Sequence, residues 1–302
     1  MNCRQASRTA ESMALFRALE SARAEGSRLF ADPFAAYFLS LSMRCAVGLA
    51  ARYPFVHAGL TRFIDQRWPG ARPSGVARTV LIDQAFREAL ASGVEQVAIL
   101  GAGYDSRAYR IDELNGIKVF EVDRGETQRL KRRRLSRIPH PVPSEVAFVE
   151  MDFLRQTLPE ALASAGFRSS IKSFFIWEGV SHYLDSCAVD SIMRFVGRCA
   201  AKSRIAFTYI DRGLLDGSKA FSVSPNVLRL LERAGEPWKF GFDPAELPFY
   251  LSVRGLKLIE DLGAIEYGAR CMGASASEMR GYEFYHVAIA EIGTVGGGSC
   301  RR

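Results

Sequence analysis

The sequence has no apolar run that approaches the length of a membrane span. Its apolar stretches, such as Val97–Leu100 and Phe174–Trp177, are far shorter than the roughly 20 residues that a transmembrane helix needs. The N-terminus reads Met-Asn-Cys-Arg and leads into a mixed polar segment, without the apolar core of a secretory signal. These absences predict a cytoplasmic protein with no membrane partner.

Closely spaced cysteines and histidine clusters are missing as well. The six cysteines are scattered singly with no CxxC pair, and the chain has only four histidines. A zinc site or a disulfide framework would show as closely spaced ligand pairs. The sequence therefore suggests neither a bound metal nor a disulfide-stabilised domain.

A second basic patch is also absent. The chain carries 40 basic and 33 acidic residues, a net charge of +7, and the basic residues concentrate in Arg129–Arg137, which contains the run Lys131-Arg-Arg-Arg134. Nucleic-acid binding would require a further basic patch interleaved with aromatic residues, and none is found. We interpret the run as the solvated face of a helix and predict no nucleic-acid partner.

What the chain does have is enough apolar sequence for a large core, since 48 % of its 302 residues are apolar. It shows no internal repeat and no linker long enough to separate two domains. We therefore predict a single domain over residues 1–302. Its expected parts are a helical cap (1–92), a ligand-binding core (93–211), a lid insertion with a helix (212–255), two final strands (256–292) and a disordered tail (293–302).

Strands and helices alternate through the middle of the chain. This pattern is typical of an α/β protein whose parallel sheet carries helices on both faces. The expected strands are 96–100, 118–122, 147–151, 173–177, 204–209, 256–261 and 282–291. The expected helices are 8–40, with a new start at Asp32-Pro33, then 43–67, 78–91, 125–138, 158–165, 187–200, 225–234 and 243–255.

A glycine turn follows the first expected strand. Gly101 and Gly103 allow the backbone to turn sharply and to approach a ligand closely. A dinucleotide fingerprint would place a third glycine at position 106, where this chain has Ser106, and Asp105 stands where a pyrophosphate would lie. A carboxylate repels phosphates but suits a cofactor with a cationic amino acid end. This favours S-adenosylmethionine over a nicotinamide cofactor, although a nicotinamide oxidoreductase or a cofactor-binding protein without turnover stays an alternative.

Acidic residues follow all five of the central strands. In an open parallel sheet, ligands bind beyond the carboxyl ends of the strands. An acid at the carboxyl end of the second strand can accept hydrogen bonds from the ribose hydroxyls of a nucleoside. Glu121 and Asp123 cannot both do so, and we favour Glu121. The acids are Asp105, then Glu121 with Asp123, then Asp152, Glu178 and Asp211.

Several segments together resemble the leucine carboxyl methyltransferase-like enzymes, a family that includes polyketide O-methyltransferases of the tetracenomycin type. The resemblance covers nearly the whole chain. It rests on Ala22-Arg-Ala24, Leu29-Phe-Ala-Asp-Pro33, Ala77-Arg-Thr79 with Ile82-Asp83, Leu100-Gly-Ala-Gly-Tyr-Asp-Ser-Arg-Ala-Tyr-Arg110, Val119-Phe-Glu-Val-Asp123 with Lys131, Trp177-Glu-Gly-Val180 with Tyr183-Leu184, Gly235-Glu-Pro237 and Phe240-Gly-Phe-Asp-Pro244.

The resemblance implies a class I methyltransferase fold, a Rossmann-like sheet, that binds S-adenosylmethionine. It also implies roles for individual residues. Gly101, Gly103 and Asp105 would flank the methionine part, Glu121 would hold the ribose, Asp152 and Phe153 would contact the adenine, Glu178 would lie near the amino group, and Arg78 would reach the carboxylate. Arg23 resembles a basic position that closes over the site in relatives, although its spacing from Asp32 varies in the family.

Purely structural roles remain open for several of these residues. Asp105 could cap the short helix that follows it, and Asp152 could end its strand in a turn. Arg78 could be a surface charge on its helix. Arg107 is expected to pair with one of the strand-tip acids rather than to touch a ligand.

The expected reaction is O-methylation of a small molecule. A carboxylate acceptor is already ionised near neutral pH and needs no base, whereas a hydroxyl would need one, for which His182 and Tyr183 are candidates. A lone histidine at a helix start is more often structural. Five aromatic residues of the insertion could line an acceptor pocket or only pack the lid: Phe221, Trp238, Phe240, Phe242 and Phe249. A protein C-terminal carboxylate is the alternative acceptor.

Overall fold

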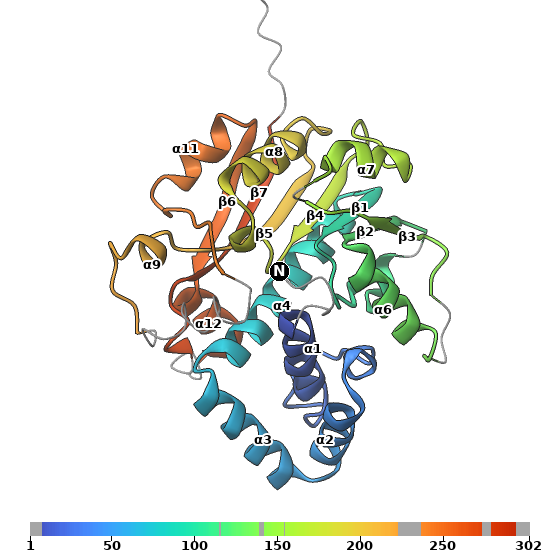
Figure 1. Cartoon of the computed structure of the whole chain (residues 1–302), viewed down its shortest axis with the longest axis vertical. Helices are drawn as coiled ribbons and strands as arrows, with labels where there is room; N and C mark the ends of the chain where they lie inside the picture. Colours follow the sequence, from blue (N-terminus) through green and yellow to red (C-terminus); the bar gives the residue numbers. More distant parts are fainter. Residues whose placement is uncertain are drawn as a thin grey trace, which may run out of the picture.

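Seven strands form one sheet in the part of the chain that the computed structural model describes, namely residues 8–114, 116–138, 142–153, 155–222, 237–273 and 279–293. The strand order is β3-β2-β1-β4-β5-β7-β6, and Figure 1 shows the sheet between helical layers. The strands are β1 (Gln96–Leu100), β2 (Lys118–Asp123), β3 (Val146–Glu150), β4 (Ser173–Trp177), β5 (Arg204–Ile210), β6 (Leu256–Gly263) and β7 (Tyr285–Ile292).

The first five strands are parallel, and β7 runs antiparallel between β5 and β6. Every residue of β1 and of β4 is buried, because helices cover both faces of these strands. This explains why they read as continuous apolar runs rather than as an alternating pattern. The strand order reverses between β1 and β4, so the carboxyl ends of these two strands form the switch point at which open α/β sheets bind ligands.

Two helical layers cover the sheet. One apolar cluster joins the sheet to α7 (Leu158–Ser164), α8 (Ser186–Val196) and α11 (Leu247–Ser252). A second cluster, on the other face, joins it to α4 (Ala71–Ala91), α5 (Arg107–Arg110) and α12 (Ala264–Met272). Apart from the helices that precede α4, the remaining described helices are α6 (Gly125–Leu135), α9 (Gly213–Asp216) and the short 3-10 turns η2 (Asp112–Leu114) and η3 (Ser181–Tyr183).

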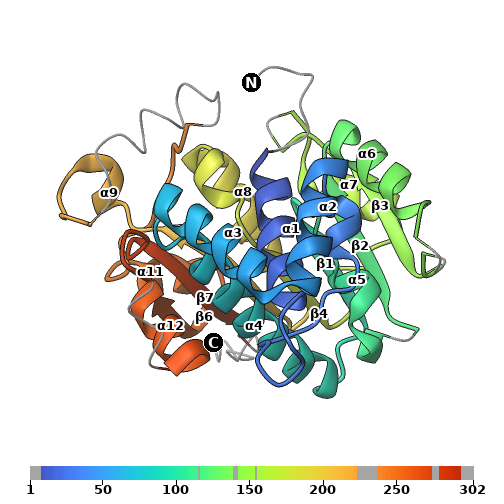
Figure 2. The ribbon, with the colours of Figure 1, turned by 90° about the horizontal axis from the view of Figure 1, so that it is seen from below.

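A third apolar cluster forms the helical cap. It joins α1 (Arg8–Ser21), η1 (Ala35–Phe38), α2 (Leu41–Arg52) and α3 (Pro54–Arg67) to Leu135 of α6 and to Tyr104 in the turn after β1. Figure 2 shows α1, α2 and α3 in front of the sheet, with α4 behind them. The residues expected to form one cap, 1–92, therefore belong to two layers. Helix α4 packs on the sheet, and only the helices that precede it form the outer layer.

The expected strands are all present, β1 and β4 with the expected bounds and the others with ends shifted by at most three residues. The expected helix 8–40 is wrong, since α1 ends at Ser21. The side chain of Glu20 accepts the Leu29 backbone N–H, and that of Asp32 accepts the Phe34 and Ala35 N–H groups. These bonds satisfy the backbone of an irregular loop, so Asp32-Pro33 starts only the single turn η1.

Other helix boundaries also differ from the expectation. The helix expected over 43–67 is split by Pro54, which begins α3, since proline is favoured in the first turn of a helix and disfavoured in its interior. α11 begins at Leu247 rather than at Asp243, whose side chain instead caps a turn at Ala245. The expected helix 225–234 and residues 294–302 of the expected tail lie outside the described residues.

Candidate functional site

The glycine turn lies at the switch point and needs glycine for two reasons. Gly101 has φ +71° and Gly103 has φ +42°, in the left-handed region that other residues rarely adopt. A Cβ at Gly101 would lie 2.3 Å from a methyl group of Val180, and one at Gly103 would lie 3.3 Å from Cβ of Ala10. The turn is therefore packed between the loop after β4 and the first residues of α1.

A buried arginine holds the acids at two of the strand tips. The guanidinium of Arg107 lies 2.5 Å from Asp105, 3.0 Å from Glu178 and 2.8 Å from Asp83. Burial opposes ionisation of Asp105, but the charges of Arg107 and Arg17 lower its pKa to about 2. Arg107 thus pairs with the strand-tip acids, as expected, and holds Asp105 and Glu178 in place while their side chains are 12 % and 15 % exposed.

The same ion-pair network continues to Arg78 on α4. Its Nε lies 3.4 Å from Glu178 Oε1, its Nη1 donates to Ser74 at 2.8 Å, and its guanidinium packs 4.2 Å from the centre of the Tyr285 ring. Arg78 is 3 % exposed, so it is not a surface charge. Through these contacts Arg78 links α4 to the residue that follows β4 and to the first residue of β7.

Ser106, the residue in place of a third glycine, connects the turn to the cap. Its hydroxyl donates to Asp32 at 2.5 Å, and Asp32 also pairs with Arg17 of α1 at 2.8 Å. Arg110 completes the chain of contacts by binding Asp83 at 2.6 Å. A sequence signal for this network is that Asp83 lies directly beside the apolar residues Leu81 and Ile82, which pack on the sheet.

Glu121 lies beneath the surface, where it pairs with Lys131 of α6. The two charged atoms are 2.8 Å apart, with the side chains 0 % and 1 % exposed. Burial raises the pKa of Glu121, against the opposing effect of Lys131. The basic run of α6 is thus not a continuous solvated face, since Lys131 is buried whereas Arg132 and Arg133 are exposed.

Asp123 lies at the tip of β2, two residues beyond Glu121 and therefore on the same face of the sheet. It is partly exposed. One carboxylate oxygen accepts the Gly103 N–H at 2.5 Å and the other accepts the Arg124 N–H at 2.6 Å. Burial raises its pKa, while these two hydrogen bonds oppose the shift. Asp123 is the acid that directly contacts the glycine turn.

The remaining expected residues lie at varying distances from the turn. Asp152 and Phe153 follow β3, and the Phe153 ring packs at the margin of the core. Asp211 caps α9 through the Gly213 N–H and pairs with Lys219 at 2.8 Å, which is a structural role. Arg23 pairs with Glu20 at 3.2 Å. The structure thus gathers Gly101, Gly103, Asp105, Asp123, Glu178 and Arg78 around the switch point.

His182 lies in η3, directly after β4, and is 2 % exposed. Its ring is surrounded by Tyr183, Trp238 and Tyr285, with ring centres 4.3, 5.3 and 5.9 Å away. Burial, together with the nearby charge of Arg78, lowers the pKa of His182 to about 3. The imidazole is therefore neutral at physiological pH.

This shift predicts a pH-dependent stability. An unfolded histidine has a pKa of about 6.5, so between pH 6.5 and 3 the unfolded chain binds a proton at His182 that the folded chain does not. Stability is then complete above pH 6.5 and falls as the pH is lowered. At pH 5 the expected loss from this group is about 2 kcal/mol.

Urea denaturation of the wild type and of His182→Phe at pH 7.5 and pH 5.0 measures this loss. The phenylalanine variant should lose about 2 kcal/mol less than the wild type over this interval. His57→Phe, whose original side chain is only partly buried, is a control for histidine replacement in general. An identical pH dependence in wild type and His182→Phe would contradict the assignment of a neutral buried imidazole.

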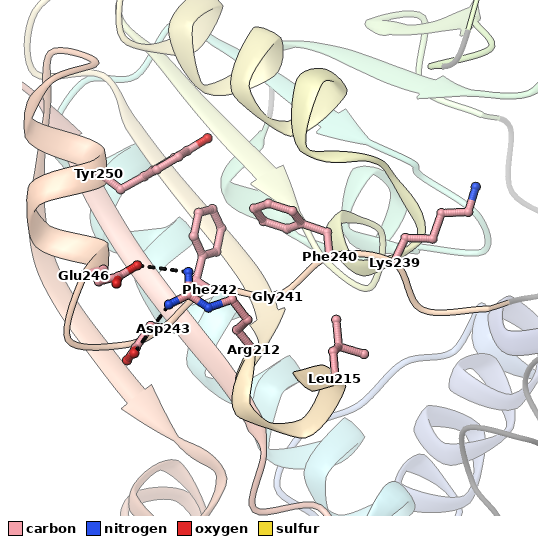
Figure 3. A pocket seen from close by; sticks show the side chains of 9 residues that line it. All are labelled: Arg212, Leu215, Lys239, Phe240, Gly241, Phe242, Asp243, Glu246 and Tyr250. Carbon is pink, nitrogen blue, oxygen red and sulfur yellow. Dashed lines mark hydrogen bonds and ion pairs between the residues drawn. The ribbon is translucent and has the colours of Figure 1, made fainter. Parts of the chain in front are cut away.

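A cavity of about 300 Å³ lies in the insertion beyond β5. Figure 3 shows Arg212 held by Asp243 and Glu246 on one side of it, at 3.7 and 3.0 Å, with Phe240 and Phe242 on another. This cavity lacks the glycine turn and its acids, so it is not the place for a nucleoside cofactor. Phe240 and Phe242 pack against the core cluster, whereas Trp238 packs against His182.

Comparisons with known proteins identify the family. A family model described as leucine carboxyl methyltransferase matches residues 10–197. A Frankia alni protein, provisionally named as an S-adenosyl-L-methionine-dependent methyltransferase, is 37 % identical over 69 % of this chain and 70 % of its own. A Streptomyces coelicolor protein with the same provisional name is 35 % identical over 71 % and 73 %.

Solved structures support the fold. A methyltransferase-like protein of Thermobifida fusca aligns over 92 % of this chain and 94 % of its own, with a TM-score of 0.54 and 15 % identity. A DUF574 family protein of Streptomyces avermitilis covers 93 % and 96 %, with a TM-score of 0.53 and 13 % identity. No helix in the described residues has the length and apolar character to cross a bilayer. The chain belongs to the leucine carboxyl methyltransferase family and is an S-adenosylmethionine-dependent methyltransferase with a class I Rossmann-like fold.

Proposed function

We propose that the protein methylates an oxygen atom of a small molecule and that the cofactor binds over the tips of β1, β2 and β4. One observation carries the site: Asp123 and the Gly101–Gly103 turn are joined by a hydrogen bond at the switch point. The turn brings its backbone close to a ligand, and the carboxylate is placed to accept ribose hydroxyls. The match to a leucine carboxyl methyltransferase model supports oxygen as the acceptor atom.

In this proposal Asp123, and not Glu121, holds the ribose. Both oxygens of Glu121 are buried and the side chain pairs with Lys131, whereas Asp123 is partly exposed at the strand tip. Asp105 and Glu178 would face the cationic amino acid end, and Arg78 its carboxylate. Asp152 and Phe153, beyond β3, would contact the adenine. Each of these positions lies at the carboxyl edge of the sheet.

The cofactor, when bound, supplies an activated methyl group on a sulfonium. The protein then has to align the acceptor oxygen with that group and keep water away. Arg107 fixes the carboxylates of Asp105 and Glu178 in place, and carboxylates at this position suit a cationic group better than phosphates. No protein nucleophile is needed for such a displacement.

We propose a carboxylate as the reacting group of the acceptor. A base is most effective when its pKa lies near the working pH, and the pKa of about 3 at His182 makes this imidazole a poor base for a hydroxyl. A carboxylate is ionised already. His182→Phe should accordingly retain most of its kcat at neutral pH, and a loss of several orders of magnitude with normal cofactor binding would instead indicate a hydroxyl acceptor.

The test of the cofactor site is the variant Asp123→Asn. A hydrogen bond to a charged group contributes roughly 1.5 to 3 kcal/mol, so Asp123→Asn should weaken S-adenosylhomocysteine binding about 10- to 150-fold. Calorimetry measures the dissociation constant, and circular dichroism checks that the variant is folded. Stabilisation of the wild type by NAD but not by S-adenosylhomocysteine in a thermal shift assay would overturn the assignment.

A further inference from the structure

The outer side of α2 and α3 exposes large apolar side chains that a globular protein rarely leaves uncovered. Leu41 and Leu49 on α2 are 78 % and 53 % exposed, and Phe55 and Phe63 on α3 are 75 % and 64 % exposed. Seven of the twelve large apolar side chains that the described residues expose most lie in the segment 41–68. A concentration of this kind marks a surface that contacts a protein or a membrane.

Helical spacing places these side chains together on one side of each helix. At about 100° per residue, Leu41 and Leu49 lie within about 80° of each other around α2, and so do Phe55 and Phe63 around α3. The opposite side of α3 is apolar as well, since Ile64 is buried in the third apolar cluster. Figure 2 shows the two helices beside each other, in front of α1 and α4. A helix on a water-exposed surface normally carries polar residues opposite its buried stripe, and α3 instead has phenylalanines there.

The charged residues of this surface are almost all arginines. The segment 41–68 has one acid, Asp65, which pairs with Arg72 at 2.6 Å. Its arginines have no ion-pair partner in the part of the chain that the structure describes, and they are Arg44, Arg52, Arg62 and Arg67. On the helices, Arg52 lies on the same side as Leu49, and Arg62 lies on the same side as Phe55. The outer face of α2 and α3 therefore complements a negatively charged partner.

This charge decides between a second copy of the chain and a membrane. A symmetric contact between two copies would bring the same arginines toward one another, and like charges across an interface repel. An anionic lipid surface attracts basic side chains, each of which strengthens binding about fivefold. Tryptophan and tyrosine are enriched at membrane–water interfaces, and α3 is flanked by the exposed Tyr53 and Trp68.

The position of the two helices allows a flat surface to reach them. Figure 1 shows α2 and α3 at one end of the molecule and α11 at the other. The expectation of no membrane partner followed from the lack of a spanning helix in the sequence. A protein that binds to the surface of a membrane needs no such helix, because an apolar face with basic residues is sufficient.

We propose that the outer face of α2 and α3 binds the surface of an anionic lipid membrane. The side chains of Leu41, Leu49, Phe55 and Phe63 enter the headgroup region, and the arginines contact lipid phosphates. The binding is peripheral and reversible. This inference is independent of the proposed function, since it involves no residue at the strand tips.

Co-sedimentation of the full-length protein with lipid vesicles tests the proposal. Vesicles of phosphatidylcholine alone are compared with vesicles in which about one third of the lipid is phosphatidylglycerol. The protein should bind the mixed vesicles much more tightly than the neutral ones. Added salt should weaken this binding, because salt screens the attraction between the arginines and the lipid.

Variants of the exposed side chains locate the contact. Phe55→Ser should weaken binding to the mixed vesicles at least about tenfold, because it removes the transfer of a phenylalanine side chain out of water. Phe249→Ser is the matched control, since Phe249 is 73 % exposed on α11 and should not contribute. Circular dichroism checks that both variants are folded.

A pair of double variants tests the arginines in the same way. Arg52→Gln with Arg62→Gln should weaken binding about 30-fold. Arg132→Gln with Arg133→Gln removes the same charge from the exposed side of α6 and should bind nearly as tightly as the wild type. If the two double variants lose equal affinity and Phe55→Ser loses none, the basic chain only adheres to anionic lipid without a defined face, and the proposal is wrong.

Two further outcomes would overturn the proposal. Equal binding to neutral and mixed vesicles, or binding to neither, would exclude an anionic membrane as the partner. Analytical ultracentrifugation without lipid identifies the competing occupant. A wild-type dimer that Phe55→Ser converts to a monomer, together with no vesicle binding, would assign the outer face of α2 and α3 to a second copy of the chain.

Discussion

Arg107→Met should lower the free energy of unfolding by at least about 3 to 5 kcal/mol, the usual effect of removing one partner from a buried ion pair. The guanidinium of Arg107 lies within 3.0 Å of Asp83, Asp105 and Glu178, and the side chains of all four residues are at most 15 % exposed. Methionine has a similar length and no charge. It would leave carboxylates in a region from which most water is excluded.

Urea denaturation at pH 7.5 measures this loss. Arg87→Met is a matched control, because Arg87 also pairs with a carboxylate, Glu113, at 3.0 Å, but both side chains are about half exposed. Exposed pairs contribute roughly 0 to 1 kcal/mol, so the control should be nearly neutral. Equal losses of unfolding free energy in the two variants would show that burial does not increase the contribution of the Arg107 ion pairs to stability.

Lys131→Met should have the second large effect, again about 3 to 5 kcal/mol. It leaves the completely buried Glu121 without its charge partner. The double variant Glu121→Gln with Lys131→Met should recover part of the loss, since removing both charges eliminates the unpaired one. Arg132→Met, an exposed neighbour on the same helix, should change stability by less than about 0.5 kcal/mol.

The same variants decide between the two acids of β2. If Glu121 is structural, Glu121→Gln should lower stability while the folded fraction still binds S-adenosylhomocysteine with nearly unchanged affinity. Asp123→Asn should show the opposite pattern. A stable Glu121→Gln protein that has lost cofactor binding would restore Glu121 as the ribose ligand, as first expected from the sequence.

The sequence was sufficient for the sheet and for the glycine turn at its switch point. Buried parallel strands are recognisable as short apolar runs, and the turn with Gly101 and Gly103 follows the first of them because only glycine fits its backbone angles and its contact with Val180. Both features are local. They depend on residues that are close together in the chain.

The ion-pair partners of the charged residues could not be predicted from such local sequence patterns. Glu121 and Asp123 point to the same face of β2, and only the packing of α6 shows that Lys131 reaches Glu121. The contact between His182 and Trp238 joins residues 56 positions apart in sequence, with α8 and β5 between them. Side-chain pairing over such separations is fixed by tertiary structure, so composition and spacing contain no direct signal for it.

The position of β7 has a consequence for synthesis of the protein on the ribosome. This strand is the last in the described chain, yet it lies between β5 and β6 and supplies Tyr285, against which Arg78 packs. Until it emerges, the edges of β5 and β6 remain unpaired, and exposed strand edges are prone to association with other chains. The nascent chain would therefore expose two unpaired strand edges until β7 is translated, and the contact of Tyr285 with Arg78 would form only after that point.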